Sequence, residues 1–384
     1  MTVAAPTPGA LGPLIDRYHA WAVDRALPLW ATRGFDAQAG LFEEQLGFDG
    51  APVLTLPRRV MVQARQIGVY ALAAERGWRD ARAQAVEAGE NLIARFWDGD
   101  GWLFSIGRDG APVDRTRDLY AHAFVLFALA WLVRVAPGPR LDDAIGRTLH
   151  TLDVRFADPR HGGHWDALPR PDALRRQNPH MHLLEAYLEL YEATRDPDHL
   201  NRASGLVALA RRAFIDAGRG SLRELFHDDW SVAPAPGQGL VEPGHQYEWA
   251  WLLRRYEDLG GEGMGEVVAA LLRSALEHGT DRRTGRIVDE LGEDGRVRAA
   301  SSRSWPHAEA LKALAVETAR GTGDHRPEIA AILSRLMTLY CPDRLDGGWI
   351  DRLSDTDEPI SAAMPASTLY HLMFALAELR RCFG

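Results

Sequence analysis

The sequence predicts an all-α protein folded as an (α/α)6 barrel, a toroid of six helical hairpins with short β-hairpins in the connecting loops. Three observations support this prediction: six short segments resemble one another at nearly constant spacing, two helical patterns fit between successive segments, and the first helix of each pair is apolar on almost every side. A closed ring accounts for the third observation, because inner helices that surround one core have no face in water. We therefore predict a single (α/α)6-barrel domain over residues 1–384.

The six repeated segments each combine an apolar or aromatic residue, an acidic or polar stretch and, in most cases, a turn signal such as Asp-Gly. This composition is typical of a short β-hairpin or turn. Successive anchor residues are 57 to 65 positions apart, which indicates a repeated structural unit. The segments are 40–52, 100–112, 162–174, 220–231, 285–296 and 347–359, and their anchors are Phe42, Trp102, Trp165, Leu222, Ile287 and Trp349.

Each interval between anchors has room for two helices. Helical patterns cover 58–78 and 81–97 in the first interval, and 178–196 and 199–217 in the third. The second pattern of each pair carries a polar face, so we expect an outer helix there and an inner helix before it. The residues ahead of the first segment predict an N-terminal helix that completes the ring. Prolines, which a helix tolerates in its first turn, stand near the start of five inner helices and mark one rim: Pro57, Pro179, Pro243, Pro306 and Pro365.

Composition restricts the class of protein further. The chain has 384 residues, 46% hydrophobic and 25% charged, with a formal net charge of −9, which is ordinary for a globular protein and excludes a fibrous or disordered one. A single core seldom grows beyond about 250–300 residues, and repeated units added around one core resolve that difficulty. No basic run could follow a phosphate backbone, so we expect no nucleic-acid partner.

Two cysteines, Cys341 and Cys382, are too few for a disulfide framework and favour a reducing cytoplasm. The N-terminal residues lack the pattern of a signal peptide, and no apolar run is long enough to span a bilayer. We therefore expect a cytoplasmic protein without a membrane partner, and leave a homodimer open.

Basic or imidazole side chains recur at nearly the same depth of the six inner helices. Counting 17 to 23 residues from each anchor finds Arg65, His122, His182, His245, His307 and His371. In a ring these side chains would converge on the axis and form a polar, aromatic-lined cavity. Keeping so many buried polar groups for packing alone would be costly, so the set favours a functional site. Neighbouring candidates at similar depth are Tyr120, Glu185, Glu248, Trp305, Glu309 and Tyr370.

Other chemistries have weaker support in the sequence. His180 and His182 point to different sides of a helix, and no H-E-x-x-H pair exists, so we expect no metal. Glu248 and Glu309 would be the opposed carboxylates of an inverting glycoside hydrolase, but the histidines fit proton transfer better. Neither a nucleophile elbow nor a Gly-rich cofactor motif occurs, and we expect no cofactor. A non-catalytic sugar-binding toroid stays open as an alternative.

At these residues the sequence resembles the N-acylglucosamine 2-epimerase family of (α/α)6-barrel sugar epimerases and aldose–ketose isomerases. The matching stretches run in order along nearly the whole chain and are closest to the mannose isomerase branch. They are VQARQIGVYA around Arg65, LYAHAFVLFALA around His122, NPHMHLLEA around His182, PGHQYEWAWLL around His245, SWPHAEALKA around Trp305 and PASTLYHLMFALAE around His371. His307 stands where relatives often have glutamine.

The resemblance implies a metal-free and cofactor-free reaction at C1 and C2 of a monosaccharide. His245 and His371 would be the acid and base, Glu248 would orient His245, and Arg65 and His182 would hold sugar oxygens. His122, Tyr120, Trp305, His307 and Glu309 complete the predicted substrate site. Trp249 offers a second flat face for the sugar, although a core aromatic explains it equally well.

Elementary chemistry agrees with these roles. Imidazole, with a pKa of about 6.5, suits proton abstraction beside a carbonyl, and a helix start after Pro243 would favour neutral His245. Glu248 lies one turn further along the same helical face. We predict an aldose–ketose isomerase that converts D-mannose to D-fructose through a cis-enediolate, with a 2-epimerase as the alternative.

Overall fold

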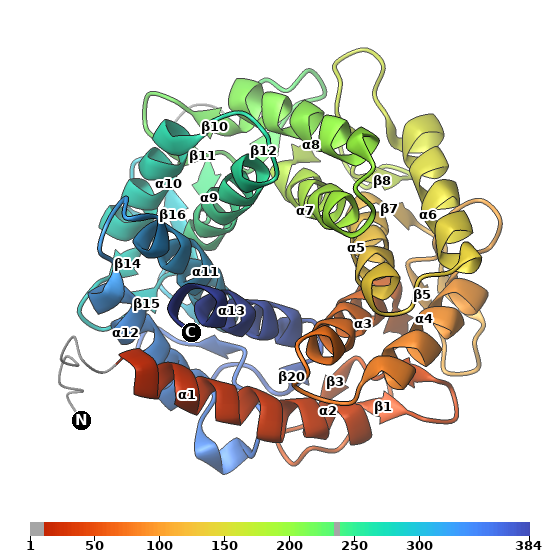
Figure 1. Cartoon of the computed structure of the whole chain (residues 1–384). Helices are drawn as coiled ribbons and strands as arrows, with labels where there is room; N and C mark the ends of the chain where they lie inside the picture. The colour runs from red at the N-terminus through yellow and green to blue at the C-terminus, as the bar shows by residue number, and fades with distance from the viewer. Residues whose placement is uncertain (1–10, 234–238) are drawn as a thin grey trace.

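The predicted (α/α)6 barrel is confirmed: two concentric rings of helices surround one axis (Figure 1). The structure, a computed structural model, describes residues 11–233 and 239–384. Residues 1–10 and 234–238 of the predicted domain 1–384 lie outside the described residues. Among the described residues, no helix is both long and apolar enough to cross a membrane. Cys341 and Cys382 are both free thiols.

The inner ring is closed, because each inner helix packs against the inner helix on either side, including the last against the first. Burial on nearly every side matches the sequence pattern; in the second inner helix every residue from Ala121 to Leu132 is buried. The inner helices are α3 (Val60–Glu75), α5 (Leu119–Val135), α7 (Gln177–Thr194), α9 (Pro243–Asp258), α11 (Ser304–Arg320) and α13 (Thr368–Phe383).

The outer ring is closed by the N-terminal helical segment, as predicted. Its first helix packs against both α13 and the last outer helix (Figure 1). The outer elements are α1 (Leu11–Trp21), η2 (Ala22–Ala26), α2 (Leu27–Thr32), α4 (Arg82–Phe96), α6 (Pro139–Thr151), η3 (Leu152–Phe156), α8 (Pro197–Leu209), η4 (Ala210–Phe214), α10 (Gly265–His278), α12 (Arg326–Arg335) and η5 (Leu336–Tyr340); η6 (Asp343–Leu345) follows them.

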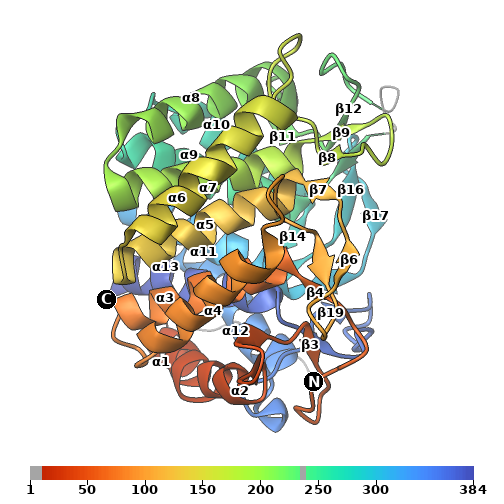
Figure 2. The same cartoon turned by 90° about the vertical axis from the view of Figure 1, so that its right-hand side faces the viewer.

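Short strands gather at one end of the barrel, beside the starts of the inner helices (Figure 2). Among the described residues, five antiparallel pairs form hairpins within a repeat. They are β1 (Phe35–Asp36) with β2 (Leu41–Phe42), β5 (Ser105–Ile106) with β6 (Pro112–Asp114), β10 (Ile215–Asp216) with β11 (Ser221–Leu222), β14 (Thr280–Asp281) with β15 (Arg286–Ile287), and β16 (Glu290–Gly292) with β17 (Val297–Ala299).

The remaining pairs join neighbouring repeats, which the hairpin prediction did not include. The strand before each inner helix pairs with a strand of the next repeat, and the sixth repeat returns to the first. The pairs are β4 (Arg58–Arg59) with β5 (Ser105–Ile106), β7 (Arg117–Asp118) with β8 (Ala167–Leu168), β9 (Arg175–Arg176) with β12 (Leu225–Phe226), β13 (Leu240–Val241) with β16 (Glu290–Gly292), β18 (Ser302–Arg303) with β19 (Arg352–Leu353), and β20 (Met364–Pro365) with β3 (Gln45–Leu46); β6 (Pro112–Asp114) and β17 (Val297–Ala299) extend two of them. This cyclic pairing brings residues of one hairpin next to the inner helix of the preceding repeat.

Candidate active site

A cavity of about 300 Å³ opens at the strand end of the barrel, and all six inner helices or the residues just before them contribute to its lining. Seven of the ten predicted site residues line this cavity: Arg65, Tyr120, His182, His245, Glu248, Trp305 and His371. The other lining residues are Asn178, Glu242, Arg303, Asp351, Pro365, Ser367 and Thr368.

His245, in the first turn of α9, is held from behind by a carboxylate of a neighbouring hairpin. Its Nδ1 lies 3.0 Å from both carboxylate oxygens of Glu224, which immediately precedes β12. Gln177 Nε2 donates a further hydrogen bond to Glu224 at 2.8 Å. With Nδ1 engaged, Nε2 is the nitrogen left for a substrate.

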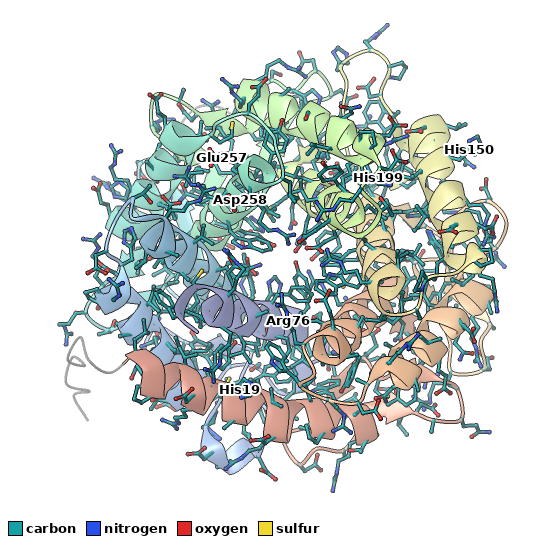
Figure 3. The ribbon with its side chains drawn as sticks, in the orientation of Figure 1. His19, Arg76, His150, His199, Glu257 and Asp258 are labelled. Carbon is teal, nitrogen blue, oxygen red and sulfur yellow. The ribbon has the colours of Figure 1, made fainter. Side chains whose placement is uncertain are left out.

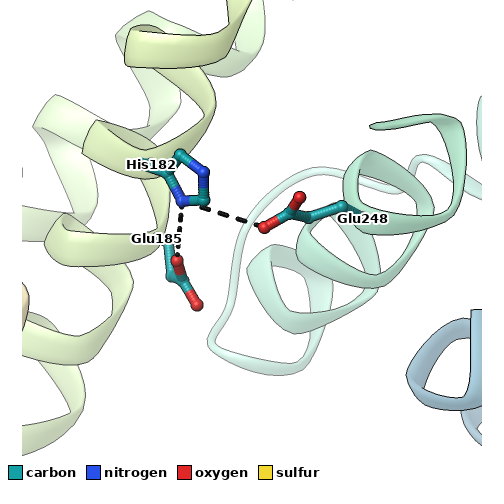
Figure 4. Close-up of side chains that lie close together, drawn as sticks. All are labelled: His182, Glu185 and Glu248. Carbon is teal, nitrogen blue, oxygen red and sulfur yellow. Dashed lines mark hydrogen bonds and ion pairs between the residues drawn. The ribbon is translucent and has the colours of Figure 1, made fainter. Parts of the chain in front are cut away.

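The predicted contact between Glu248 and His245 is replaced by the contact with Glu224. Glu248 lies one turn deeper in α9, where its Oε1 is 3.8 Å from His182 Nδ1 on α7 (Figure 4). The Nδ1 atom of His245 instead faces Glu224, next to β12. Shared helical spacing puts two residues on one face, but it does not decide which way an imidazole turns.

His371 on α13 is held by a second carboxylate. Its Nδ1 lies 2.6 Å from Glu309 Oε1, so Nε2 is again left for a substrate. Glu309 is completely buried and stands behind His371 rather than in the cavity lining. Behind it in turn, Lys312 Nζ lies 2.5 Å from Glu309 Oε2.

Trp305 lies beside both His245 and His371. The centroid of its ring system is 5.2 Å from that of His245 and 5.6 Å from that of His371. Its apolar face is therefore available beside both imidazoles, as predicted. Trp249 is instead a supporting residue: it is fully buried and donates from Nε1 to Gln177 Oε1 at 2.6 Å.

A third cluster lies deeper in the barrel. His182 Nδ1 is 3.1 Å from Glu185 Oε2 (Figure 4). Glu185 also accepts a hydrogen bond from Tyr370. Tyr120 meets the His182 ring edge-on, with centroids 4.8 Å apart. The structure therefore places His182, not His180, at the cavity.

Arg65 is 4% exposed and is fixed by contacts on several sides. Its Nη1 donates to the Ser367 carbonyl at 3.2 Å and its Nη2 donates to the Tyr120 hydroxyl. The guanidinium carbon lies 4.1 Å from the centre of the Phe124 ring. A preorganised cation of this kind is suited to stabilise charge that develops on a sugar oxygen.

Two predicted substrate residues, His122 and His307, do not reach the cavity. Each is fully buried, and each Nδ1 lies within 2.8 Å of the carbonyl oxygen four residues earlier. Each Nε2 accepts a hydrogen bond from the backbone N–H of an anchor residue, Trp102 or Ile287. Counting residues gave the correct depth but not the direction, so these histidines join a hairpin to a helix instead of facing the axis.

Two of the three cavity histidines, His245 and His371, differ in charge. Burial by itself lowers the pKa of His245, but the carboxylates of Glu224 and Glu242 raise it to about 9. The predicted neutral form is therefore reversed, because these charges outweigh the helix start. Burial holds the pKa of His371 well below 6.5, and Arg65 reinforces this effect. At neutral pH His245 is thus an imidazolium and His371 a neutral imidazole.

Glu248 is one of several carboxyl groups of the site whose pKa is raised by burial; the others are Glu242, Glu309 and Asp351. Burial, assisted by the nearby charge of Glu309, raises the pKa of Glu248 well above 4.5. Glu248 Oε1 also has no hydrogen-bond partner among the described residues. A protonated carboxylic acid at the cavity wall can donate a hydrogen bond to a sugar oxygen.

Sequence reasoning missed Glu224 and Lys312, although each left a signal. An acidic residue follows the anchor by two positions in four of the six repeats, at Glu44, Glu224, Asp289 and Asp351. Lys312 is the one lysine in a chain with 44 lysine and arginine residues. Neither signal alone predicts which histidine lies next to Glu224, or which one lies next to the carboxylate that Lys312 contacts.

Among the described residues, three groups of side chains bring possible metal-ligand atoms within 4.8 Å of one another. Their members already bind protein partners: Glu185 binds Tyr370, and Glu242 accepts a hydrogen bond from Arg303 at 2.9 Å. The Lys312 ammonium at Glu309 would repel a cation at close range. The donor sets therefore fit internal hydrogen bonding better than metal binding. The groups are His182, Glu185 and Glu248; Glu224, Glu242 and His245; and Glu248, Glu309 and His371.

A second cavity, of about 210 Å³, lies at the opposite end of the barrel, where Arg76 and Asp258 mark the ends of α3 and α9 (Figure 3). None of the predicted site residues lines it. Its arginines and acidic residues pair with one another, as Arg134 does with Glu189. The candidate active site is therefore the cavity at the strand end.

Comparison with known proteins agrees with the fold and shows the family. The family model described as N-acylglucosamine 2-epimerase matches residues 40–375. A mannose-6-phosphate isomerase of Rhizobium meliloti (strain 1021) is 35% identical over 94% of this chain and 95% of its own length, and a D-mannose isomerase of Thermobifida fusca is 29% identical over 88% and 90%. The solved cellobiose 2-epimerase of Spirochaeta thermophila has the same fold, with a TM-score of 0.85 at 23% identity over 98% of this chain and 99% of that one. The chain therefore belongs to the N-acylglucosamine 2-epimerase family.

Proposed function

We propose that this protein is an aldose–ketose isomerase that interconverts D-mannose and D-fructose, with His371 as the general base and His245 as the general acid. The chain is a sugar isomerase or epimerase, as its family and the names of its relatives indicate, so the proposal concerns which reaction and which sugar. One observation carries it: two imidazoles of opposite charge preference, each held at Nδ1 by its own carboxylate, line one cavity.

In the proposed reaction the sugar ring opens and exposes the C1 aldehyde. His371 Nε2 removes the proton from C2 while His245 donates a proton to the C1 oxygen, which gives a cis-enediol. Return of a proton to C1 and loss of the proton on the C2 oxygen then give the ketose, with no atom gained or lost. Imidazole is suited to both transfers because its pKa can be set on either side of neutrality.

The remaining cavity residues would bind and stabilise the sugar. Arg65 supplies a fixed positive charge for the enediolate oxygen, and Tyr120 and His182 supply polar groups for hydroxyls. Protonated Glu248 adds a hydrogen-bond donor. Trp305 provides an apolar face for the carbon skeleton.

The charges at the cavity favour an unphosphorylated sugar. Of the two lining arginines, Arg303 is bound by Glu242 at 2.9 Å and by Asp289 at 3.1 Å, while Arg65 has the protein partners described above. Three carboxyl groups, Glu242, Glu248 and Asp351, also line the cavity. A phosphate dianion needs unpaired cations, and the residues outside the described ranges include no lysine or arginine. We therefore propose mannose, as in the name of the Thermobifida fusca relative, rather than mannose 6-phosphate.

The test is incubation of the purified protein with D-mannose in D2O, followed by NMR. We expect fructose as the product, with activity that survives dialysis against a chelator. Glucose as the sole product would replace the isomerase with a 2-epimerase. Sugar binding without any deuterium incorporation would favour the non-catalytic alternative.

The substrate class is tested by comparing kcat/KM for mannose and mannose 6-phosphate in the same preparation. We expect the phosphorylated sugar to be at least about tenfold poorer, because its dianion would meet the carboxyl groups of the cavity. A higher kcat/KM for mannose 6-phosphate would contradict the proposed substrate but not the isomerase mechanism.

A further inference from the structure

Lys312 stands out in both the sequence and the structure. It is the one lysine of the chain, whereas every other residue of the 44 in the lysine and arginine count is an arginine. Its side chain is completely buried in α11. Its Nζ lies 2.5 Å from Glu309 Oε2 and 3.8 Å from the centre of the Trp251 ring. The residue therefore adjoins the site without lining the cavity.

A buried ammonium is costly unless a specific partner compensates for the loss of water. Arginine, which this chain uses at every other cationic position, would bring a larger planar group with five donors into a space with no solvent. Lysine provides a compact point charge at one carboxylate oxygen. This residue choice indicates that the site needs positive charge behind Glu309.

We propose that Lys312 is a positioning residue that acts through Glu309 to keep Nε2 of His371 unprotonated and ready to act as a base. This inference rests on the proposed role of His371. Glu309 must accept a hydrogen bond from His371 Nδ1 to fix the ring. An unopposed carboxylate there would also draw an extra proton to the pair, and the Lys312 ammonium removes that tendency.

The charges that face His371 balance when Lys312 is included. The cations are Lys312 from α11 and Arg65 from α3, and the anions are Glu309 from α11 and Glu185 from α7. Beyond Trp305, the His245 imidazolium of α9 is paired with Glu224. His182 on α7 and Glu248 on α9 are neutral at neutral pH, because burial lowers the pKa of His182 to about 4 and, with Glu309, raises that of Glu248. Tyr370, beside His371 on α13, is also neutral because burial raises its pKa. Removing Lys312 leaves one excess negative charge.

That excess charge would be neutralised by a proton on the Glu309–His371 pair. If the proton lies on the imidazole, His371 is an imidazolium and cannot act as a base. If it lies on Glu309, the carboxylic acid donates to Nδ1 and the imidazole carries its own proton on Nε2. In both cases Nε2 loses the free electron pair that removes the C2 proton.

His245 shows the alternative arrangement within the same cavity. Glu224 contacts His245 Nδ1 just as Glu309 contacts His371 Nδ1, but the hydrogen-bonding neighbour behind Glu224 is the uncharged Gln177. There Glu224, together with Glu242, keeps the imidazole protonated. The acid and the base thus differ in two ways: His245 has a second carboxylate nearby, and His371 has Lys312 behind its carboxylate.

The first test reads charge directly and needs no substrate. Protein labelled with 15N-histidine is examined by NMR at pH 7, and the His371 signals are assigned by their loss in H371Q. We expect an unprotonated Nε2 in the wild type and a protonated Nε2 in K312M. In the double variant E309Q/K312M, the amide carbonyl accepts from Nδ1 without adding charge, so Nε2 should again be unprotonated. A protonated Nε2 in the wild type, or an unchanged Nε2 in K312M, overturns the proposal.

A second measurement covers the case in which K312M does not fold. Protein labelled with 13C-lysine gives a single side-chain signal, since Lys312 is the one lysine. The wild-type signal should be that of a charged ammonium at pH 7, and in E309Q its titration should move to lower pH by at least about one unit. A neutral amine in the wild type, or an unmoved titration in E309Q, overturns the proposal.

The third test connects Lys312 to turnover. In K312M the acid limb of kcat/KM for mannose should move up by at least about one pH unit, so that activity falls about tenfold or more at pH 6 and recovers in alkaline solution. A loss that is equal at every pH would mean a merely structural role and would overturn the proposal. If the NMR results are as expected but mannose is not converted, the proposed function fails and the charge coupling stands.

Discussion

Two sets of buried histidines occur in the same repeated framework, and they differ in what their ring nitrogens contact. In the first set, which we call the bridging histidines, Nδ1 faces a backbone carbonyl and Nε2 accepts from a backbone N–H of the preceding hairpin segment. In the second set, Nδ1 faces a carboxylate and Nε2 is left for the cavity. The bridging histidines are His122, His180 and His307, and the cavity histidines are His182, His245 and His371.

The comparison shows that the partner of Nδ1, and not the extent of burial, distinguishes histidines that face the cavity from those that join a hairpin to a helix. Backbone groups carry no net charge, and burial lowers the pKa of His122 to about 4 and that of His307 to about 3. Among the cavity histidines, Glu224 and Glu242 raise the pKa of His245 to about 9, whereas burial lowers that of His182 to about 4 and that of His371 well below 6.5. In the first repeat Gln63 makes the bridge, because it binds both the N–H and the carbonyl of Phe42. The bridge therefore needs a donor and an acceptor but not an imidazole.

The largest expected effect is on turnover. H245Q and H371Q should each lower kcat by about 10³-fold or more, because each removes a group that transfers a proton. Their thermal unfolding should stay close to that of the wild type, since both residues adjoin a cavity. Steady-state kinetics with mannose and calorimetry measure the two effects. Nearly normal activity in either variant would remove that histidine from the mechanism.

The opposite result is expected for a bridging histidine. H307A should lower the free energy of unfolding by about 2–4 kcal/mol, because it leaves a buried cavity and an unpaired Ile287 N–H. H307Q is the matched variant, since Gln63 already makes this bridge in the first repeat, and it should recover most of the loss. Chemical denaturation measures both. A tenfold loss of kcat/KM in a stable H307Q would return His307 to the substrate site.

The difference between bridging and cavity histidines also shows which features of the structure could be predicted from the sequence. The period, the two helical rings and the N-terminal closing helix could be predicted, because apolar periodicity and regular spacing are local signals. The direction of each side chain could not. The counted positions vary over 17 to 23 residues, which is more than one helical turn, so His122 and His371 were equally plausible cavity residues. Glu224 and His245 belong to the same repeat, but the position of Glu224 depends on the pairing of β12 with β9 of the preceding repeat, which no local pattern indicates.

The bridging histidines should also make the free energy of unfolding fall in acid. Their pKa values are lowered in the folded state, so below about pH 6.5 the unfolded chain binds protons that the folded chain excludes. Stability is therefore complete above pH 6.5 and is lost as the pH falls toward the folded-state values. Each such histidine contributes about 1.4 kcal/mol per pH unit in that window. Between pH 7 and pH 5, H307Q should lose about 2 kcal/mol less than the wild type in urea denaturation; equal losses would contradict the neutral state of buried His307.

The smallest expected effect concerns the carboxylate that makes His245 an acid. His245 is active when protonated, so kcat/KM should hold up to a pH near 9 and fall above it. In E224Q the alkaline limb should move to lower pH, although Glu242, with Oε1 at 4.0 Å from Nδ1, keeps part of the rise. Activity at pH 7 should change by less than about threefold, and activity at pH 8.5 should fall by roughly tenfold.

Glu44→Gln is the matched control, because Glu44 occupies the corresponding place in the first repeat and binds Arg59 instead of a histidine. An alkaline limb that moves in both variants, or in neither, would mean that the contact between Glu224 and Nδ1 does not set the charge of His245, and the separation of the two histidine sets by their partners would then fail at its most specific point.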